Sequence, residues 1–264
     1  MGAGQIPKRT GQAVTTASVT TLADNACTLS EFGIVVALPE ELRTLTSHKI
    51  QPGECLQLGT LWIAHSGAGW QNAEAAARLL IGKGVKGLIS WGCAAGLSHT
   101  VKPGNLVLAS CIVSDNQAFD TDTLWREHLQ QQLSALNDTH MGWLFTSKKL
   151  ISSSLLKQQI SQQSQAIALD MESAAIADVA KNANLPCLAI RSIADPVDQD
   201  LPLAVLNSLN ADGQIELPRL FRHLFLHPWE LNGLIRLGRH FHAAQKTLKT
   251  VARLLNLHQL RIAT

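Results

Sequence analysis

The sequence lacks three features that would each define a class of protein. It has no run of about 18 apolar residues, so we expect no membrane-spanning helix. Residues 1–30 are polar and rich in Thr, Ala and Ser, without the apolar stretch of a signal peptide, so we expect a disordered extension. The five cysteines include no CxxC pair, which argues against a zinc site or a redox pair. We therefore expect reduced thiols in a cytoplasmic protein, with no metal and no cofactor.

The remaining composition is typical of a globular protein. Apolar residues make up 46% of the 264 residues and charged residues 16%, which allows one large domain with its own core. The formal net charge of +2 says little about partners by itself. We find neither an internal repeat nor a low-complexity tract.

Short apolar runs alternate with helical patterns along the chain. The runs are rich in apolar and β-branched residues and are bounded by Gly, Pro or charged residues, so they predict buried strands. They cover residues 32–38, 61–65, 85–91, 105–113, 165–169 and 185–193. Helices are expected over 71–80 and 171–182. This alternation predicts an α/β fold, a single domain with a central mixed β-sheet flanked by helices.

Ligands of such sheets bind beyond the carboxyl ends of the strands, so residues at strand ends are the informative ones. Glu41, Glu172 and Asp195 follow three different predicted strands. Each acid alone also fits a structural role, in a first helical turn or in an Asp-Pro turn. We interpret residues 66–69 and 92–96 as glycine-rich strand-to-helix turns. Their backbone N–H groups could hold an anion, although such turns also serve tight packing.

The segment from Arg219 onward differs in character from the rest. It carries eight Lys and Arg residues against one acid, Glu230, and its Leu, Ile and Phe residues recur at roughly helical spacing. This pattern predicts a basic amphipathic helical C-terminal region over residues 216–264. Such a helix can lie in a lipid interface, cap its own domain or contact another subunit. The missing motif and near-neutral net charge argue against nucleic-acid binding.

Six short motifs then occur in order between residues 32 and 200. They are Ala37-Leu-Pro-Glu-Glu-Leu42, Ser66-Gly-Ala-Gly69, Gly92-Cys-Ala-Ala-Gly-Leu97, Val101-Lys-Pro-Gly-Asn105, Asp170-Met-Glu-Ser-Ala174 and Ile193-Ala-Asp-Pro-Val-Asp198. Together they resemble the methylthioadenosine/adenosylhomocysteine nucleosidases and the wider nucleoside phosphorylase superfamily. The resemblance implies a catalytic domain over residues 31–215 that cleaves a bond between adenine and a ribose carbon. It also implies a homo-oligomer, because this superfamily commonly pairs subunits beside the active sites.

The resemblance also implies roles for individual residues. Asp195 would donate a proton or hydrogen bond to N7 of adenine, which requires a carboxyl with a raised pKa. Glu172 would accept hydrogen bonds from the ribose 2′ and 3′ hydroxyls, and Met171 would pack under the sugar. Glu41 matches the acid that orients or deprotonates the nucleophilic water in the nucleosidases. Leu150 and Ile151 would form apolar walls of the base pocket.

The nucleophile is either water or inorganic phosphate. The residues expected around it are Ser66, Gly67, Gly69, Gly92 and Cys93. Cys93 stands where the nucleosidases tend to have Ser, which weakens that anchor. Arg43 and Arg191 could supply a cation or could pair with an acid. Glu41 favours water, whereas the branch of the superfamily described next favours phosphate, which we narrowly prefer at this stage.

Within the superfamily the chain looks most like the hopanoid-associated phosphorylases. The pointers are Ala189-Ile-Arg-Ser-Ile-Ala-Asp-Pro196, Leu201-Pro202, Asp212-Gly213 and the long basic C-terminal region. Those proteins are thought to remove adenine from adenosylhopane, leaving ribosyl- or phosphoribosyl-hopane. This implies a lipid-linked adenine nucleoside as substrate and peripheral contact with the inner face of the membrane. The alternatives are a methylthioadenosine/adenosylhomocysteine nucleosidase, a nucleoside-binding protein without catalysis and an unrelated α/β binding module.

Overall fold

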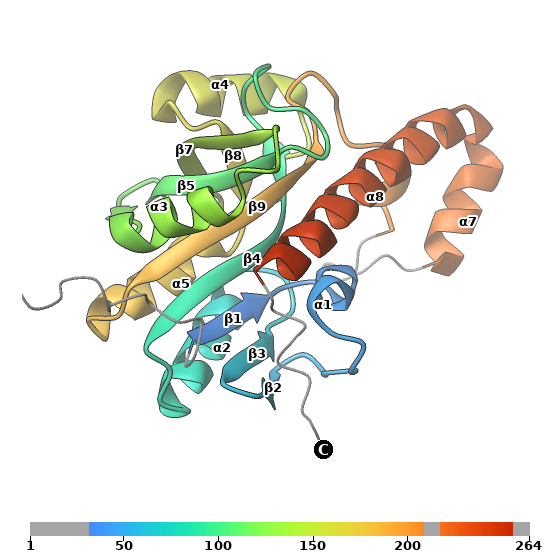
Figure 1. Cartoon of the computed structure of the whole chain (residues 1–264). Coiled ribbons are helices and arrows are strands. Elements are labelled where there is room, and N and C mark those ends of the chain that lie inside the picture. The colour runs from blue at the N-terminus through green and yellow to red at the C-terminus, as the bar shows by residue number, and fades with distance from the viewer. Residues whose placement is uncertain (1–31, 209–216, 256–264) are drawn as a thin grey trace, which may run out of the picture.

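The computed structural model describes residues 32–208 and 217–255 (Figure 1). The extension predicted over residues 1–30 and the Asp212-Gly213 pair lie outside these ranges. The described residues form one α/β unit around a single mixed sheet, which confirms the predicted fold class.

The sheet has nine strands in the order β2-β3-β1-β4-β8-β7-β5-β6, and β9 pairs with both β4 and β5. Parallel pairing joins β3, β1, β4 and β9, as well as β5, β7 and β8. The strands are β1 (Phe32–Val36), β2 (Glu54–Leu58), β3 (Leu61–His65), β4 (Gly87–Gly96), β5 (Leu106–Val113), β6 (Ala118–Asp120), β7 (Thr139–Thr146), β8 (Ala168–Asp170) and β9 (Cys187–Asp195). All residues of β1 and β9 are buried, as expected for central strands covered on both faces.

Helices cover both faces of the sheet, and the sheet separates two large apolar clusters. On one face, α2 (Trp70–Gly82) and α5 (Ser173–Asn182) pack against each other through a row of alanines. On the other face, α3 (Thr123–Gln132) and α8 (Leu231–Leu254) share an apolar cluster with β1 and β9. The remaining helices are α1 (Pro39–Leu45), α4 (Ser154–Ser164), α6 (Leu203–Leu206), α7 (Leu217–Leu226) and the short η1 (Pro228–Glu230).

The second glycine-rich segment differs from its interpretation as a strand-to-helix turn. Residues 92–96 continue β4, which runs to Gly96 and pairs with β9 and β8 around a bulge between Ala94 and Ala95. No helix follows directly. The first segment, residues 66–69, does connect β3 to α2 as predicted. The long β4 carries its backbone past the ends of β1 and β3, into the region where a ligand would bind.

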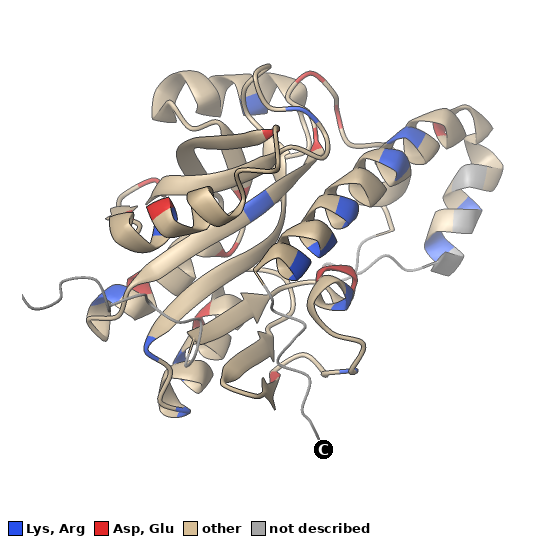
Figure 2. Ribbon diagram, viewed as in Figure 1, with Lys and Arg blue, Asp and Glu red and all other residues tan. Residues whose placement is uncertain are grey.

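The basic C-terminal region forms α7, η1 and α8 (Figure 1). The second half of α8 joins the core through Ala244, Leu248 and Val251, and Thr247 Oγ1 donates a hydrogen bond of 2.6 Å to the Gly104 carbonyl. Lys and Arg recur along the exposed side of α8 (Figure 2). Within the described ranges no helix combines the length and hydropathy needed to cross a bilayer.

Candidate active site

A cavity of about 590 Å³ opens at the carboxyl ends of β1, β4, β8 and β9. The strand ends bring together residues that lie more than 150 positions apart in the sequence. The sequence-predicted residues on its wall are Glu41, Gly69, Cys93, Leu150, Ile151, Met171, Glu172 and Asp195. Each acid comes from a different strand end, as the α/β pattern predicts.

Glu41 reaches the cavity from the first turn of α1. Pro39 begins this helix directly after β1, and the Glu41 side chain folds back so that Oε2 accepts a hydrogen bond of 3.1 Å from the Leu38 N–H. Oε1 accepts a bond of 2.7 Å from the Cys93 N–H on β4. Burial raises the pKa of Glu41, and the nearby Arg191 together with these backbone donors opposes the rise. The Glu41 carboxylate therefore already accepts the hydrogen bond that the Cys93 N–H, in the second glycine-rich segment, could otherwise donate to a bound anion.

Glu172 stands at the junction of β8 and α5. Its Oε1 accepts a hydrogen bond of 2.9 Å from the Gly69 N–H, where the first glycine-rich turn enters α2. Its Oε2 lies 3.3 Å from the Met171 N–H. Burial and the neighbouring Asp170 raise the pKa of Glu172 to about 7, against the opposing effect of Arg191. This carboxyl therefore changes charge near neutral pH.

A buried cation lies beneath these acids. Arg191, on β9, is 2% exposed and forms an ion pair of 2.6 Å with Asp170. The same Nη2 donates hydrogen bonds to the Ser90 and Ser173 hydroxyls at 2.6 and 3.1 Å. Asp170 is held in turn by Thr146 Oγ1 at 2.7 Å. Arg191 is thus tied to structural partners, and its charge acts on Glu41 and Glu172 through space.

Asp195 ends β9 and also lines the cavity. Its Oδ2 accepts a hydrogen bond of 2.9 Å from Lys157 Nζ on α4. Burial raises the pKa of Asp195, and Lys157 partly offsets this. A raised pKa favours the protonated form of a carboxyl, which is the form that can donate a proton.

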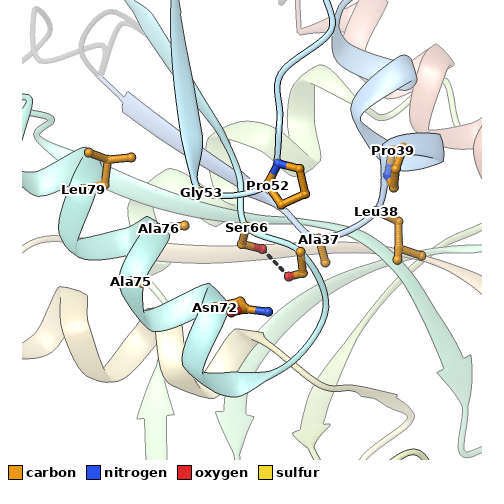
Figure 3. A pocket seen from close by; sticks show the side chains of 11 residues that line it. Ala37, Leu38, Pro39, Pro52, Gly53, Ser66, Asn72, Ala75, Ala76 and Leu79 are labelled. Atoms are coloured by element: carbon orange, nitrogen blue, oxygen red, sulfur yellow. Dashed lines mark hydrogen bonds between the residues drawn. The ribbon is translucent and has the colours of Figure 1, made fainter. Parts of the chain in front are cut away.

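The remaining predicted residues lie elsewhere. Ser66 and Gly67 line a separate cavity of about 420 Å³ between the β3–α2 turn and residues 52–53 (Figure 3). The Ser66 hydroxyl donates to the Gly67 carbonyl of its own loop at 2.7 Å and also lies 3.1 Å from the Val36 carbonyl of β1. Gly92 is not on the wall but lies beneath it, where a Cβ would collide with Arg191 Nη1 and with Glu41 Oε1. Arg43 is paired with Glu40 at the surface.

Cys93 presents its backbone N–H to Glu41 rather than a reactive sulfur. Burial and the negative charge of Glu41 raise the pKa of its thiol well above the usual value. The thiol therefore stays neutral, and we assign it no nucleophilic role.

Sequence reasoning missed three contributors to this site. Lys157 was not singled out, because a lone lysine in a polar helix carries no recognisable signal. Asp170 belonged to a quoted motif but received no role, although its place at a strand end was a usable clue. Phe241 of α8 and two residues of the α6 region, Leu201 and Val205, form an apolar wall. Their contribution depends on how the C-terminal region packs, which the local pattern does not reveal.

Comparisons with known proteins agree with this architecture. No curated protein matches the chain in sequence. Among solved structures, futalosine hydrolase of Helicobacter pylori superposes with a TM-score of 0.64 at 16% identity, covering 86% of this chain and 97% of its own. The methylthioadenosine/adenosylhomocysteine nucleosidase of Neisseria meningitidis, bound to methylthio-immucillin-A, gives 0.63 at 18% identity over 84% and 97%. The corresponding S. pneumoniae nucleosidase gives 0.63 at 20% identity over 86% and 97%.

These similarities to solved structures concern the fold. The family is established by the sequence pattern of the phosphorylase superfamily, which matches residues 31–214, more than half of the chain. We conclude that the chain is an enzyme that belongs to the phosphorylase superfamily.

Proposed function

We propose that the enzyme hydrolyses the N-glycosidic bond of an adenine nucleoside. The observation that carries this proposal is the convergence of Glu41, Glu172 and Asp195 on one cavity from three strand ends. Breaking the bond between C1′ and N9 leaves positive charge on the sugar and negative charge on the base. The cavity brings these three acids together, and burial raises the pKa of each of them. We assign a carboxylate to the cationic sugar and a protonated carboxyl to the anionic base.

In this mechanism each acid has one task. Asp195 gives its proton to N7 while the electron pair of the C1′–N9 bond passes into the purine. Glu172 accepts hydrogen bonds from the ribose 2′ and 3′ hydroxyls and, as a carboxylate, stabilises the cationic sugar. Glu41 takes a proton from the water whose oxygen bonds to C1′. Met171 packs under the sugar, and Leu150 and Ile151 flank the base. Proton exchange with solvent then returns Asp195 and Glu41 to their starting states.

The position of Glu41 favours water over phosphate as the nucleophile. Of the groups expected to hold phosphate, the Cys93 N–H donates to Glu41 and Arg191 is paired with Asp170. A dianion placed there would also face the Glu41 carboxylate. We therefore propose hydrolysis, and this revises the narrow preference for phosphate drawn from the hopanoid branch.

The substrate we propose is lipid-linked, with adenosylhopane as the specific candidate. Leu201, Val205 and Phe241 give the cavity one apolar wall, which suits a hydrocarbon attached to the ribose. The helices behind this wall carry large exposed apolar side chains, including Phe225 at 88% and Trp229 at 70% exposure. An apolar route from the cavity to a membrane surface would let the nucleoside enter without releasing its lipid into water.

A soluble methylthioadenosine or adenosylhomocysteine substrate is the second candidate. It is favoured by the fold shared with the Neisseria meningitidis and S. pneumoniae nucleosidases. It is also favoured by the position of Glu41, which suits activation of a water nucleophile. The methyl group on the sulfur of methylthioadenosine would occupy the same wall near Phe241. Both candidates require the same three acids, so they differ only in what the apolar wall accommodates.

Adenine release is the test of this proposal. The enzyme is incubated with adenosylhopane in vesicles, or with methylthioadenosine, each with and without phosphate, and adenine is quantified by chromatography. We expect phosphate-independent release from the lipid, and a loss of about 10²–10⁴-fold in kcat for Asp195→Asn. Strict dependence on phosphate would reject hydrolysis, and turnover of methylthioadenosine alone would reject the lipid. No release from either, or full activity in Asp195→Asn, would reject the mechanism and favour a binding protein.

A further inference from the structure

The Lys157 side chain is fully buried behind Asp195. Its ammonium group donates hydrogen bonds to Asp195 Oδ2 at 2.9 Å, to the Pro196 carbonyl at 2.6 Å and to the Gln199 carbonyl at 2.7 Å. An ammonium has three donors and no acceptor, so these three acceptors satisfy it completely in its charged form. These three acceptors therefore form a buried site for one positive charge.

Burying a lysine is costly unless an opposite charge compensates it. Removing one partner of a buried pair typically costs several kcal/mol, because the other charge is left without compensation. Asp195 is the only carboxylate within ion-pairing distance of Lys157 among the described residues. Asp198 and Asp200, on the following segment, add negative charge nearby without bonding the ammonium. Lys157 and Asp195 are therefore an electrostatic unit.

The geometry leaves the other oxygen of Asp195 available. Oδ2 is held by Lys157, whereas Oδ1 accepts no hydrogen bond from the part of the chain that the structure describes. Asp195 also lines the cavity. The pair thus presents one oxygen to a ligand and anchors the other to a fixed cation.

We propose that Lys157 is a positioning residue that sets the acid strength of Asp195 in the glycosidic cleavage. When the Oδ1 proton passes to N7 and the C1′–N9 electron pair enters the purine, a carboxylate forms beside an ammonium that is already in place. The cation stabilises this product of proton transfer and requires no reorganisation at that moment. Its bonds to Pro196 and Gln199 also hold the segment after β9, so that Asp195 faces the base. This inference rests on the proposed function.

The test compares a charge-removing and a charge-keeping variant on two kinds of substrate. Lys157→Met retains an unbranched side chain without charge, and Lys157→Arg retains the charge. Methylthioadenosine, or adenosylhopane if only that is turned over, requires a protonated leaving group. A 4-nitrophenyl riboside does not, because its phenolate leaves unaided. The matched control is Lys181→Met on α5, whose ammonium lies over the Phe119 ring away from this cavity.

For Lys157→Met we expect kcat on the adenine nucleoside to fall about 100-fold, with the nitrophenyl riboside changed less than about threefold. Without the cation the pKa of Asp195 rises further, so the basic limb of the pH–rate profile moves to higher pH. Lys157→Arg should leave that limb near its wild-type position, and Lys181→Met should change neither substrate. Equal losses on both substrates with an unmoved limb would mean a purely structural role and overturn the proposal.

A double variant keeps the inference testable if Lys157→Met does not fold. Lys157→Met with Asp195→Asn leaves no unpaired buried charge. If Lys157 acts through Asp195, this double variant should be no slower than Asp195→Asn alone. A further loss of about 100-fold when Lys157→Met is added to Asp195→Asn would overturn the proposal. A wild-type enzyme that releases no adenine would instead reject the underlying function, so the two failures are distinguishable.

Discussion

Three carboxyl groups share one buried guanidinium in this site. Glu41, Asp170 and Glu172 all act electrostatically on Arg191, and only Asp170 pairs with it directly. The acids outnumber the cation in this site. Burial raises the pKa values of Glu41 and Glu172 in spite of the nearby arginine, and the negative charge of Asp170 adds to the rise at Glu172. The same excess of negative charge favours a cationic sugar over a neutral one. Under the proposed mechanism, this negative charge would stabilise the transition state, in which the sugar becomes cationic.

Glu172 should therefore impose an acid limb on the reaction. Its pKa is raised to about 7, so the stabilising carboxylate is present above pH 7 and is lost as the pH falls through that value. We expect kcat/KM of the wild type to fall about tenfold per pH unit below the limb. Glu172→Gln should be much slower, and its residual rate should lack this limb. The measurement is a set of initial rates from about pH 5 to about pH 9 in buffers of constant ionic strength.

The control for this assignment is Glu40→Gln. Glu40 is the neighbouring acid of α1 and pairs with Arg43 at the surface, so its loss should leave the profile unchanged. A limb that persists near pH 7 in Glu172→Gln would belong to another group, with Glu41 the first to consider.

At the scale of elements, β4 decides the geometry of the site. Residues 92–96 were interpreted as a glycine-rich strand-to-helix turn, yet pairing with β9 and β8 keeps them extended. Gly92 is required because Arg191 and Glu41 both pass where its side chain would be. The strand therefore supplies the Cys93 N–H to Glu41, and the residue before Cys93 has to be glycine because no side chain fits there.

Gly92→Ala tests this role of β4. The new Cβ would lie 2.5 Å from Glu41 Oε1 and closer still to Arg191 Nη1, so both side chains would have to move. We expect a destabilisation of about 1–3 kcal/mol from overpacking and a loss of at least about 100-fold in kcat, as Glu41 leaves the Cys93 N–H. Chemical denaturation and adenine release measure the two effects.

Gly238→Ala on α8 is the matched control, because nothing lies within 4 Å of a Cβ there. It should keep full activity and gain about 0.5–1 kcal/mol in the free energy of unfolding, since alanine is the better helix former. If Gly92→Ala retained wild-type activity, the hydrogen bond from Cys93 to Glu41 would have no role in the reaction.

Much of this architecture could be predicted from local patterns. Central strands such as β1 and β9 are continuous apolar runs, and the acids at their ends follow from the rule that α/β sheets bind ligands there. Lys157 could not be predicted, because its role depends on how its own helix, α4, packs against Asp195, which lies 38 positions further along the chain. Strands β2 and β7 were likewise missed, whereas the packing of α8 on its own domain was one of the alternatives that the sequence left open. The pairing of β7 with β5 and β8 is long-range, whereas β2 forms a local hairpin with the adjacent β3.

At the scale of the whole molecule, the C-terminal helices carry one cavity-lining residue and several exposed apolar side chains. Phe241 lines the cavity from the middle of α8, whereas the neighbouring α7, η1 and the start of α8 expose five large apolar side chains. We call these the α7–α8 surface: Phe225, Leu226, Trp229, Leu231 and Ile235, exposed by 88, 58, 70, 48 and 45% respectively. Exposed Arg222, Arg236 and Arg239 lie on the same helices (Figure 2). Apolar side chains bordered by arginines are typical of a helix that lies in a lipid interface.

Vesicle binding should consequently depend on the α7–α8 surface. Sedimentation with anionic phosphatidylglycerol vesicles should retain the wild type, and Phe225→Ser with Trp229→Ser should weaken retention at least about tenfold, because two large side chains no longer enter the lipid. Raising the salt to about 0.5 M should weaken the arginine contribution. Leu124→Ser, which removes a side chain 80% exposed on α3, should change nothing.

The same variants separate a membrane surface from a subunit contact, because both would bury these side chains. If the double variant binds vesicles as well as the wild type but loses an oligomer in light scattering, the α7–α8 surface joins two subunits and the membrane assignment is wrong. If it loses vesicle binding, its kcat on methylthioadenosine should be unaltered, since neither side chain lines the cavity. Its turnover of a vesicle-borne nucleoside should then fall in proportion to the bound fraction, because a lipid-linked substrate is met only at the membrane.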